Sequence, residues 1–256
     1  MSFALNADVR IHYEVEGSGP PLVLQHGFTD TLEAWHEHGY VDDLAGTYQL
    51  ILLDARGHGL SDKPHDPAAY TLEQLASDVT TVLDAEGVEK THFYGYSMGG
   101  RIAYGMAKHA PERLLSLMVG GIPPYGNIER STQFVALLEQ GVAGFIAAFE
   151  AVSPLSPGLK ARMEACDIDA LIAMQGCRLL KDDDVVGALG ALTCPYWLIA
   201  GDADLLAPYS EIVEYAKTLP GTPLITLPGL DHFQGLERSD MVLPHLHDFF
   251  DKVSSA

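Results

Sequence analysis

The sequence predicts an α/β fold in which a mostly parallel sheet is covered by helices on both faces. Short apolar runs alternate along the chain with longer segments whose apolar residues recur at helical spacing. The runs are too continuously apolar for strands with one face in water, which is typical of buried parallel strands. With 256 residues, 47% of them hydrophobic, the chain can bury one large core. We therefore expect one main globular domain.

The predicted strands are short apolar runs bounded by turn-forming residues. The first of them alternates polar and apolar residues, as expected of an edge strand. They cover Val9–Val15, Pro21–Gln25, Gln49–Leu53, His92–Tyr96, Leu114–Val119, Tyr196–Ala200 and Leu224–Leu227.

The predicted helices follow several of these strands. Thr71 is a favourable N-cap, and Gln74 three positions later completes a capping-box pattern. The helices cover Thr71–Ala85, Met98–Lys108, Ser210–Thr218 and Asp240–Lys252.

Residues 122–192 show no strand pattern and predict a helical cap. Pro123–Pro124 and Cys194–Pro195 mark the points where the chain leaves the sheet and returns to it. The core domain would then comprise residues 1–121 and 193–256. The apolar stripe of this segment either packs the cap on the core or forms a surface for self-association. Its members are Phe134, Leu137, Leu138, Val142, Phe145 and Ile146.

Composition excludes several classes of partner. A net charge of -20 repels phosphate backbones and anionic lipids, so we expect no nucleic-acid and no membrane partner. No apolar run approaches the roughly 20 residues needed to cross a bilayer, and the first ten residues lack a signal-peptide pattern. Three cysteines at spacings that suit neither zinc nor disulfides fit a reducing compartment. A cytoplasmic location follows, and the sequence assigns no oligomeric state.

The segment around Ser97 carries the clearest chemical signal. Gly95-Tyr96-Ser97-Met98-Gly99 follows the pattern Gly-x-Ser-x-Gly and joins a predicted strand to a predicted helix. A serine at such a sharp turn needs small neighbours so that strand and helix can approach, which pushes its hydroxyl into a pocket. The loop lacks the glycine and lysine spacings of nucleotide-binding loops. Ser97 is therefore the predicted nucleophile.

A serine hydroxyl is a weak nucleophile, so a base must take its proton and a carboxylate must orient that base. His232 lies just beyond the last predicted strand, at the carboxyl end where open α/β sheets bind ligands. Another predicted strand ends in Asp202 and Asp204, of which one can face the histidine. We assign Asp204 as the catalytic acid and Asp202 as a residue that holds the turn through local hydrogen bonds.

Other polar residues receive structural interpretations. Asp231 adjoins the predicted base, but neighbouring side chains diverge, so we interpret it as a surface acid. His26 and His58 sit beside glycines in tight turns and are expected to make structural hydrogen bonds. His36 and His38 lack further ligands at metal-binding spacing, so no metal site is predicted.

The tetrahedral intermediate of acyl transfer also needs hydrogen-bond donors. In Gln25-His26-Gly27-Phe28 the chain turns after a strand and presents the amide of Phe28. This amide can pair with that of Met98 to form an oxyanion hole.

Taken together, these motifs resemble the α/β-hydrolase superfamily, in particular its compact members with a helical cap after the sixth strand of an eight-stranded sheet. They occur in the family's order over nearly the whole chain. The resemblance implies an eight-stranded sheet and a structural role for the Asp54–Asp62 run, including Arg56. The matching features are His26-Gly27-Phe28, Asp54–Asp62, the turn around Ser97, Gly201–Asp204 and His232.

The resemblance implies hydrolysis without a cofactor, and we expect small uncharged carboxylic esters as substrates. Serine at position 97 disfavours the dehalogenase and epoxide hydrolase branches, which use aspartate there. Trp35, Tyr96 and Tyr125 are the predicted pocket residues. The same serine would also serve a carbon-carbon bond hydrolase, a lactonase or a perhydrolase. Carbon-carbon hydrolases usually carry asparagine in place of Tyr96.

The alternative from another class is a ligand-sensing receptor that retains the triad. The sensors of this superfamily usually lack the paired glycines Gly99–Gly100 that this chain has.

Overall fold

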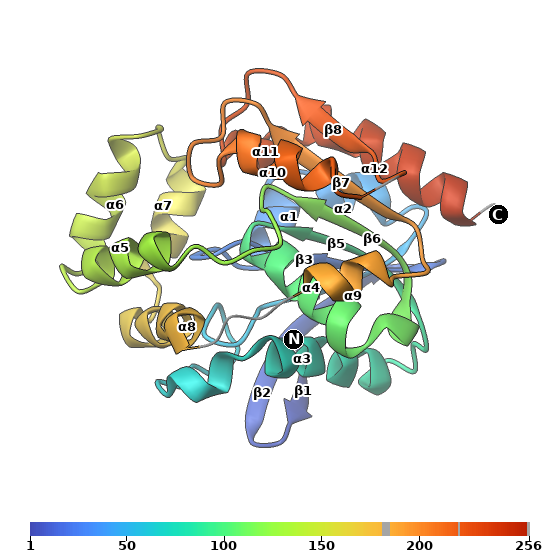
Figure 1. Ribbon diagram of the computed structural model, residues 1–256. Coiled ribbons are helices and arrows are strands. Elements are labelled where there is room, and N and C mark those ends of the chain that lie inside the picture. The colour runs from blue at the N-terminus through green and yellow to red at the C-terminus, as the bar shows by residue number, and fades with distance from the viewer. Residues whose placement is uncertain (181–184, 220, 255–256) are drawn as a thin grey trace.

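The computed structural model describes residues 1–180, 185–219 and 221–254, and within them eight strands form one twisted sheet (Figure 1). Their order in the sheet is β1-β2-β4-β3-β5-β6-β7-β8. From β4 to β8 all neighbours are parallel, whereas β1, β2 and β4 pair antiparallel. The strands are β1 (Ser2–Asn6), β2 (Val9–Gly17), β3 (Pro21–Gln25), β4 (Gln49–Leu53), β5 (Thr91–Tyr96), β6 (Leu114–Gly120), β7 (Tyr196–Gly201) and β8 (Leu224–Leu227).

The N-terminal hairpin corrects one prediction. The strand that begins at Val9 is second in the sheet, and β1 is the edge strand. The two strands are joined by a tight turn in which Ala7 has a φ of 54°. The sequence lacks the Asn-Gly or Asp-Gly signal that usually marks such turns, which is why β1 was not predicted.

Helices cover both faces of the sheet, which confirms the predicted fold class. One core layer contains apolar side chains of α3, α4, α9 and α10, and the other contains those of α1, α2, α11 and α12. These helices are α1 (Glu33–Glu37), α2 (Tyr40–Leu44), α3 (Leu72–Ala85), α4 (Met98–His109), α9 (Val186–Gly190), α10 (Tyr209–Ala216), α11 (Gln234–Glu237) and α12 (Ser239–Ser254), with short 3-10 turns at Pro67–Tyr70 and Pro111–Arg113.

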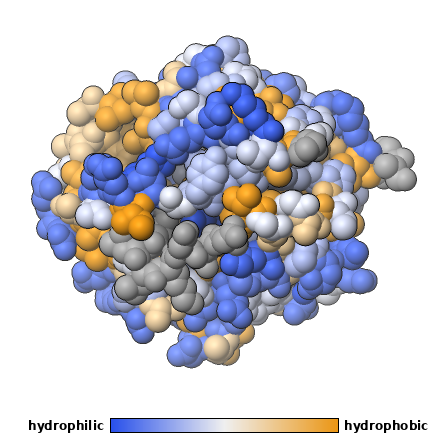
Figure 2. Space-filling model, in the orientation of Figure 1, coloured by the Kyte–Doolittle hydropathy of each residue, from blue (hydrophilic) through white to orange (hydrophobic). Residues whose placement is uncertain are grey.

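Between β6 and β7 the chain forms a helical segment on one side of the sheet (Figure 1). Leu138, Phe145 and Ile146 of its apolar stripe are buried in a cluster of their own, and the other stripe residues are partly buried against it. Phe28, Leu206 and Phe233 of the sheet loops also pack against this cluster. Figure 2 shows apolar residues gathered around α6 on a face that is otherwise mostly hydrophilic. Four residues of the predicted cap, 181–184, and residues 220, 255 and 256 of the predicted core lie outside the described residues. The helices of this segment before α9 are α5 (Ile128–Leu138), α6 (Val142–Glu150), α7 (Pro157–Glu164) and α8 (Ile168–Leu180).

Of the helices in the described ranges, none combines the length and the apolar character that a membrane span requires.

A buried ion pair ties the loop after β4 to α3. The guanidinium of Arg56 donates to both carboxylate oxygens of Asp78, at 2.6 and 2.5 Å, and to the carbonyl of Ala69. Both charged residues are 3% exposed. These contacts account for the structural role expected of Arg56.

Replacing Arg56 with methionine should lower the free energy of unfolding by about 3–5 kcal/mol, because Asp78 would be left buried without its partner. Urea denaturation would measure the loss. Arg10→Met is the matched control, since Arg10 pairs with Asp62 at the surface and such pairs contribute little. Equal losses in the two variants would contradict this interpretation of the buried pair.

Candidate active site

The turn at Ser97 joins β5 to α4 and has an unusual backbone conformation. Ser97 has a φ of 53° and a ψ of -112°, a left-handed conformation that non-glycine residues rarely adopt. A Cβ atom at Gly95 would overlap the carbonyl of Gly99, and one at Gly99 would overlap the carbonyl of Gln25 at the end of β3. The spacing Gly-x-Ser-x-Gly is therefore required by the close approach of β3, β5 and α4.

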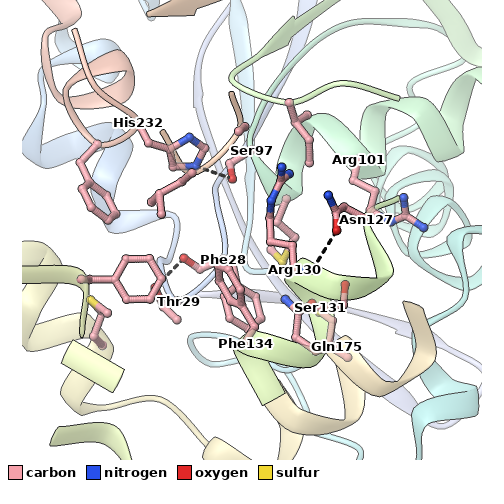
Figure 3. A pocket seen from close by; sticks show the side chains of 18 of the residues that line it. Phe28, Thr29, Ser97, Arg101, Asn127, Arg130, Ser131, Phe134, Gln175 and His232 are labelled. Carbon is pink, nitrogen blue, oxygen red and sulfur yellow. Dashed lines mark hydrogen bonds between the residues drawn. The ribbon is translucent and has the colours of Figure 1, made fainter. Parts of the chain in front are cut away.

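Ser97, His232 and Asp204 form a continuous hydrogen-bonded series, with Ser97 and His232 drawn in Figure 3. The Nε2 atom of His232 lies 2.8 Å from the Oγ of Ser97, and its Nδ1 lies 2.6 Å from the Oδ2 of Asp204. The other carboxylate oxygen of Asp204 accepts hydrogen bonds from the amides of Leu206 and Ala207. The Asp204 side chain is fully buried, so one fixed oxygen faces the imidazole. Nδ1 then donates to this oxygen, and Nε2 can accept the serine proton.

The two neighbouring acids have different tasks. Asp202 was expected to hold its own turn through local hydrogen bonds, but its Oδ1 accepts from the amide of Gly229, which lies in the loop after β8. Asp231 was interpreted as a surface acid, but its Oδ1 accepts from the amides of Phe233 and Gln234 at the start of α11. Its Oδ2 accepts from the hydroxyl of Ser153 in the helical segment. Asp231 therefore connects the His232 loop to that segment.

Tyr96 fixes the other side of the histidine loop. Its hydroxyl donates to the backbone carbonyl of His232 at 2.7 Å. Burial raises the pKa of Tyr96 well above its ordinary value, so the hydroxyl keeps its proton. A Cβ at Gly235 would overlap this hydroxyl. Tyr96 also lines a small recess beside Ser97.

Two backbone amides lie beside Ser97. In the part of the chain that the structure describes, neither the amide of Phe28 nor that of Met98 has a protein acceptor. Met98 is the first residue of α4, where amides have no partner within the helix. Gly27 packs close to Ser97, since a Cβ there would lie 3.6 Å from the serine Cβ. The amide of Met98 is therefore in the nucleophile turn, and Phe28 lies in the neighbouring loop after β3 and lines the same cavity as Ser97.

A cavity opens above Ser97, between the sheet loops and the helical segment. Much of its wall is aromatic or aliphatic, including Phe28, Phe134, Phe149 and Phe233. One end is polar instead, and Figure 3 shows this end across Ser97 from His232. The polar residues there are Arg101, Asn127, Arg130, Ser131 and Gln175.

Two of the predicted pocket residues need correction. Trp35 is completely buried and packs with Tyr40 and Tyr94 in the core beneath the sheet. Tyr125 is 43% exposed and stacks edge-on against Tyr215, so it lies outside the residues that line the described cavities. Aromatic character alone does not distinguish pocket wall from core, since both bury apolar rings.

The arginines of the cavity were not predicted. Arg101 could have been found, because it lies one helical turn after Ser97 on α4, and its amide donates to the Ser97 carbonyl. Arg130 gave no such signal. It lies in the first turn of α5, and the tertiary packing of that helix against α6, α8 and Phe28 brings it to the site.

The remaining histidines of the predicted turns are structural. The Nε2 of His26 accepts from the amide of Ala55, and the Nε2 of His58 accepts from the amide of Thr29. Burial lowers the pKa of His58 to about 3, so this imidazole stays neutral. His36 contacts Glu14.

One group among the described residues brings three possible metal ligands together. Ligand atoms of His65, Asp167 and Asp169 lie within 4.8 Å of one another. His65 already pairs with Asp167, whose Oδ1 also accepts from the amide of Ala170 at the start of α8. This group is at the surface and is separate from the residues that line the Ser97 cavity.

Comparison with protein families gives one clear match. Residues 20–167 match the model of a family described as alpha/beta hydrolase fold. This range contains the Phe28 loop and the nucleophile turn, and it covers more than half of the chain.

Known proteins of several activities are similar to this chain. A fluoroacetate dehalogenase of a Burkholderia species is 39% identical over half of the chain, and the match spans 43% of that relative's length. A pimeloyl-[acyl-carrier protein] methyl ester esterase of Xanthomonas campestris is 29% identical over 93% of this chain and 98% of its own. A solved hydrolase structure from Pseudomonas aeruginosa has 27% identity and a TM-score of 0.83, covering 97% of each chain.

Gly99→Ala should destabilise the protein by about 3 kcal/mol or more, because the new methyl group overlaps a backbone carbonyl that cannot move aside. Gly176→Ala is the control. It lies inside α8, where a new Cβ would lie 3.6 Å from the side chain of Pro67, so alanine should stabilise the helix by about 0.5–1 kcal/mol. Urea unfolding curves of both variants would test the pair. A tolerated Gly99→Ala would mean that the turn does not need this close approach.

Proposed function

Because the chain belongs to the alpha/beta hydrolase fold family, we propose that it is a serine hydrolase that cleaves carboxylic esters through an acyl-enzyme. One observation carries the proposal: the Ser97 hydroxyl is hydrogen-bonded to His232, which is hydrogen-bonded to the buried Asp204. This is the arrangement that makes a serine hydroxyl nucleophilic.

In the first half of the reaction, the Ser97 Oγ attacks the ester carbonyl while its proton passes to the Nε2 of His232. Asp204 stabilises the resulting imidazolium and keeps it oriented. When the tetrahedral intermediate collapses, the carbon–oxygen bond to the alcohol breaks, and the alcohol leaves with the proton from Nε2. The acyl group remains on Ser97.

In the second half, water loses a proton to the same histidine and attacks the acyl carbonyl. The serine recovers its proton as the carboxylic acid is released. In both tetrahedral intermediates, the negatively charged oxygen accepts hydrogen bonds from the amides of Phe28 and Met98. Each such donor contributes on the order of 3 kcal/mol to transition-state stabilisation. The route uses only groups of the chain and water.

The relatives support ester cleavage more than displacement at a saturated carbon. The esterase matches almost the whole chain, whereas the dehalogenase matches half of it. A serine that displaced halide would also form an ether, which water and a histidine do not cleave. Lactones are cyclic esters and fit the same chemistry.

The helical segment acts as a cap in this proposal. Residues 122–192 contribute one wall of the cavity through α5, α6, α7 and α8. Closing an active site in this way excludes water and strengthens electrostatic interactions inside it.

Ser97→Ala should lower kcat/KM for short p-nitrophenyl esters by about 10⁴-fold or more, since the nucleophile is lost. A fluorophosphonate probe should add to wild type, seen by intact mass, and not to the variant. Ser116→Ala is the control, because the Oγ of Ser116 also contacts a histidine, His92, but both are buried away from the cavity. Wild type that neither turns over nor takes up the probe would refute the proposal and favour ligand binding without catalysis.

Asp204→Asn should reduce kcat by about 10⁴-fold, because an amide stabilises the wrong imidazole tautomer and leaves the imidazolium uncompensated. Asp202→Asn keeps an oxygen for the amide of Gly229 and should retain most of the activity. Steady-state kinetics of the two variants on the same ester would compare them. Similar losses at both positions would contradict the assignment of Asp204.

A further inference from the structure

A small recess lies beside Ser97 in addition to the large cavity. Ser97 and His232 line both spaces, so the nucleophile and its base lie between them. The large cavity has a volume of about 100 Å³, and the recess has a volume of about 40 Å³. A water molecule needs roughly 10–15 Å³. The recess is therefore large enough for water, while the mostly apolar large cavity suits the acyl chain.

His38 and Glu237 bring polar atoms to the recess from different parts of the chain. His38 follows α1, and Glu237 is the last residue of α11. The hydroxyl of Tyr40 donates to the carbonyl of Leu236 at 2.8 Å, which ties the start of α2 to α11. This contact explains why His38 and Glu237, although far apart in the sequence, line one recess.

Each of these two residues has a buried atom that needs a hydrogen-bond partner. In the described part of the chain, the Nε2 of His38 and the Oε1 of Glu237 have none. Asp30 also lines the recess but differs, because its Oδ1 accepts from the Nε of Arg162 and the amide of Thr31. Two unpaired buried polar atoms are costly, so the recess suits a small polar molecule that contacts both.

Water meets the requirements of both atoms. A carboxylate oxygen only accepts, so the partner of the Glu237 Oε1 must be a donor, whereas the Nε2 of an imidazole such as His38 can donate. Water donates and accepts at once. An anion would have no hydrogen to offer the carboxylate, and an apolar group would leave both atoms unpaired.

The recess is also placed correctly for the base. A water that gives its proton to the Nε2 of His232 must lie within hydrogen-bond reach of that atom. The polar end of the large cavity lies across Ser97 from His232 in Figure 3, so it cannot hold a water there. The polar groups of the recess share its lining with His232 and can do so.

We propose that the recess holds the water that hydrolyses the acyl-enzyme, and that Glu237 makes the enzyme prefer water to alcohols as the second nucleophile. This inference rests on the proposed acyl-enzyme mechanism. One O–H group of the water donates to the Nε2 of His232 and the other to the Oε1 of Glu237. One lone pair attacks the acyl carbonyl carbon, and the remaining lone pair accepts from the Nε2 of His38.

The step is balanced by the groups already present. The new carbon–oxygen bond forms as the first proton of the water passes to His232. The bond from the acyl carbon to the Oγ of Ser97 then breaks, and the serine takes that proton back. The second proton of the water stays on the new carboxylic acid until solvent removes it, so Glu237 orients the water and undergoes no net change.

An alcohol cannot make the same set of contacts, because it has a single O–H group. When an alcohol attacks the acyl-enzyme, that proton must go to His232, and the Oε1 of Glu237 stays unpaired. Glu237 therefore favours hydrolysis over transfer of the acyl group to an alcohol, although both reactions use the same triad.

The experiment measures how the hexanoyl-enzyme divides between water and methanol. Wild type and variants would turn over p-nitrophenyl hexanoate in buffer that contains methanol, and chromatography at early times would quantify hexanoic acid and methyl hexanoate. Glu237→Leu should raise the ratio of methyl ester to acid by about tenfold, as expected for a lost hydrogen bond to a charged group. Glu237→Gln keeps an oxygen that can accept, so its increase should be smaller.

The product ratio does not depend on how much of a variant is folded, because both products come from the same acyl-enzyme. Quenched-flow intact mass would follow formation and decay of that acyl-enzyme on Ser97. In buffer without methanol, Glu237→Leu should slow the decay by about tenfold and leave the formation nearly unchanged, since the water acts after the alcohol has left. Glu14→Leu is the matched control, because Glu14 also lies beside a histidine, His36, but outside the recess.

The outcomes separate the two proposals. A ratio that Glu237→Leu leaves unchanged, or changes no more than Glu14→Leu does, would overturn the role of Glu237 and leave the hydrolase function standing. Equal slowing of formation and decay with an unchanged ratio would show that Glu237 is structural. Absence of both turnover and acyl-enzyme in wild type would overturn the hydrolase function itself.

Discussion

The turn at Ser97 is the constraint on which the rest of the site depends. A φ of 53° at a serine is costly, and it is maintained because β3, β5 and α4 are packed so closely that glycine alone fits at positions 95 and 99. This close approach aims the serine hydroxyl outward. It also places the free amide of Met98 and the Phe28 loop next to that hydroxyl, so one packing arrangement provides both the nucleophile and the donors around it.

The histidine loop is held by groups from three separate elements. Asp204 follows β7, Tyr96 ends β5, and Ser153 belongs to the helical segment and reaches the loop through Asp231. Asp204 holds the imidazole of His232, and Tyr96 holds its backbone carbonyl. Asp231 holds the turn that follows His232. The hydrogen bond from Ser153 therefore ties the helical segment directly to the loop that carries His232.

The features that local chemistry determines could be predicted from the sequence. The strand-turn-helix around Ser97 follows from glycine spacing and apolar runs, and the fold class follows from the alternation of buried strands and helices. The pairing of β1 could not be predicted, because its turn uses alanine at a positive φ. The prediction for Trp35 was wrong for another reason: the sequence does not distinguish an aromatic ring in the core from one that lines a pocket. Arg130 reaches the cavity through tertiary packing of α5 against α6, α8 and Phe28, which no local pattern encodes.

The average charge of the chain does not determine the potential inside its cavity. A net charge of -20 suggests that anions are repelled, but exposed charges more than a Debye length apart, about 8 Å at physiological ionic strength, are largely screened from each other. Inside a cavity with apolar walls screening is weaker, so the few charges in the wall dominate the local potential. Arg101 and Arg130 are such charges, and Glu211 lies 3.2 Å from Arg130. An acidic surface and a cation-lined cavity are thus compatible, because the surface charge governs solubility whereas the residues that line the cavity determine which ligand it binds.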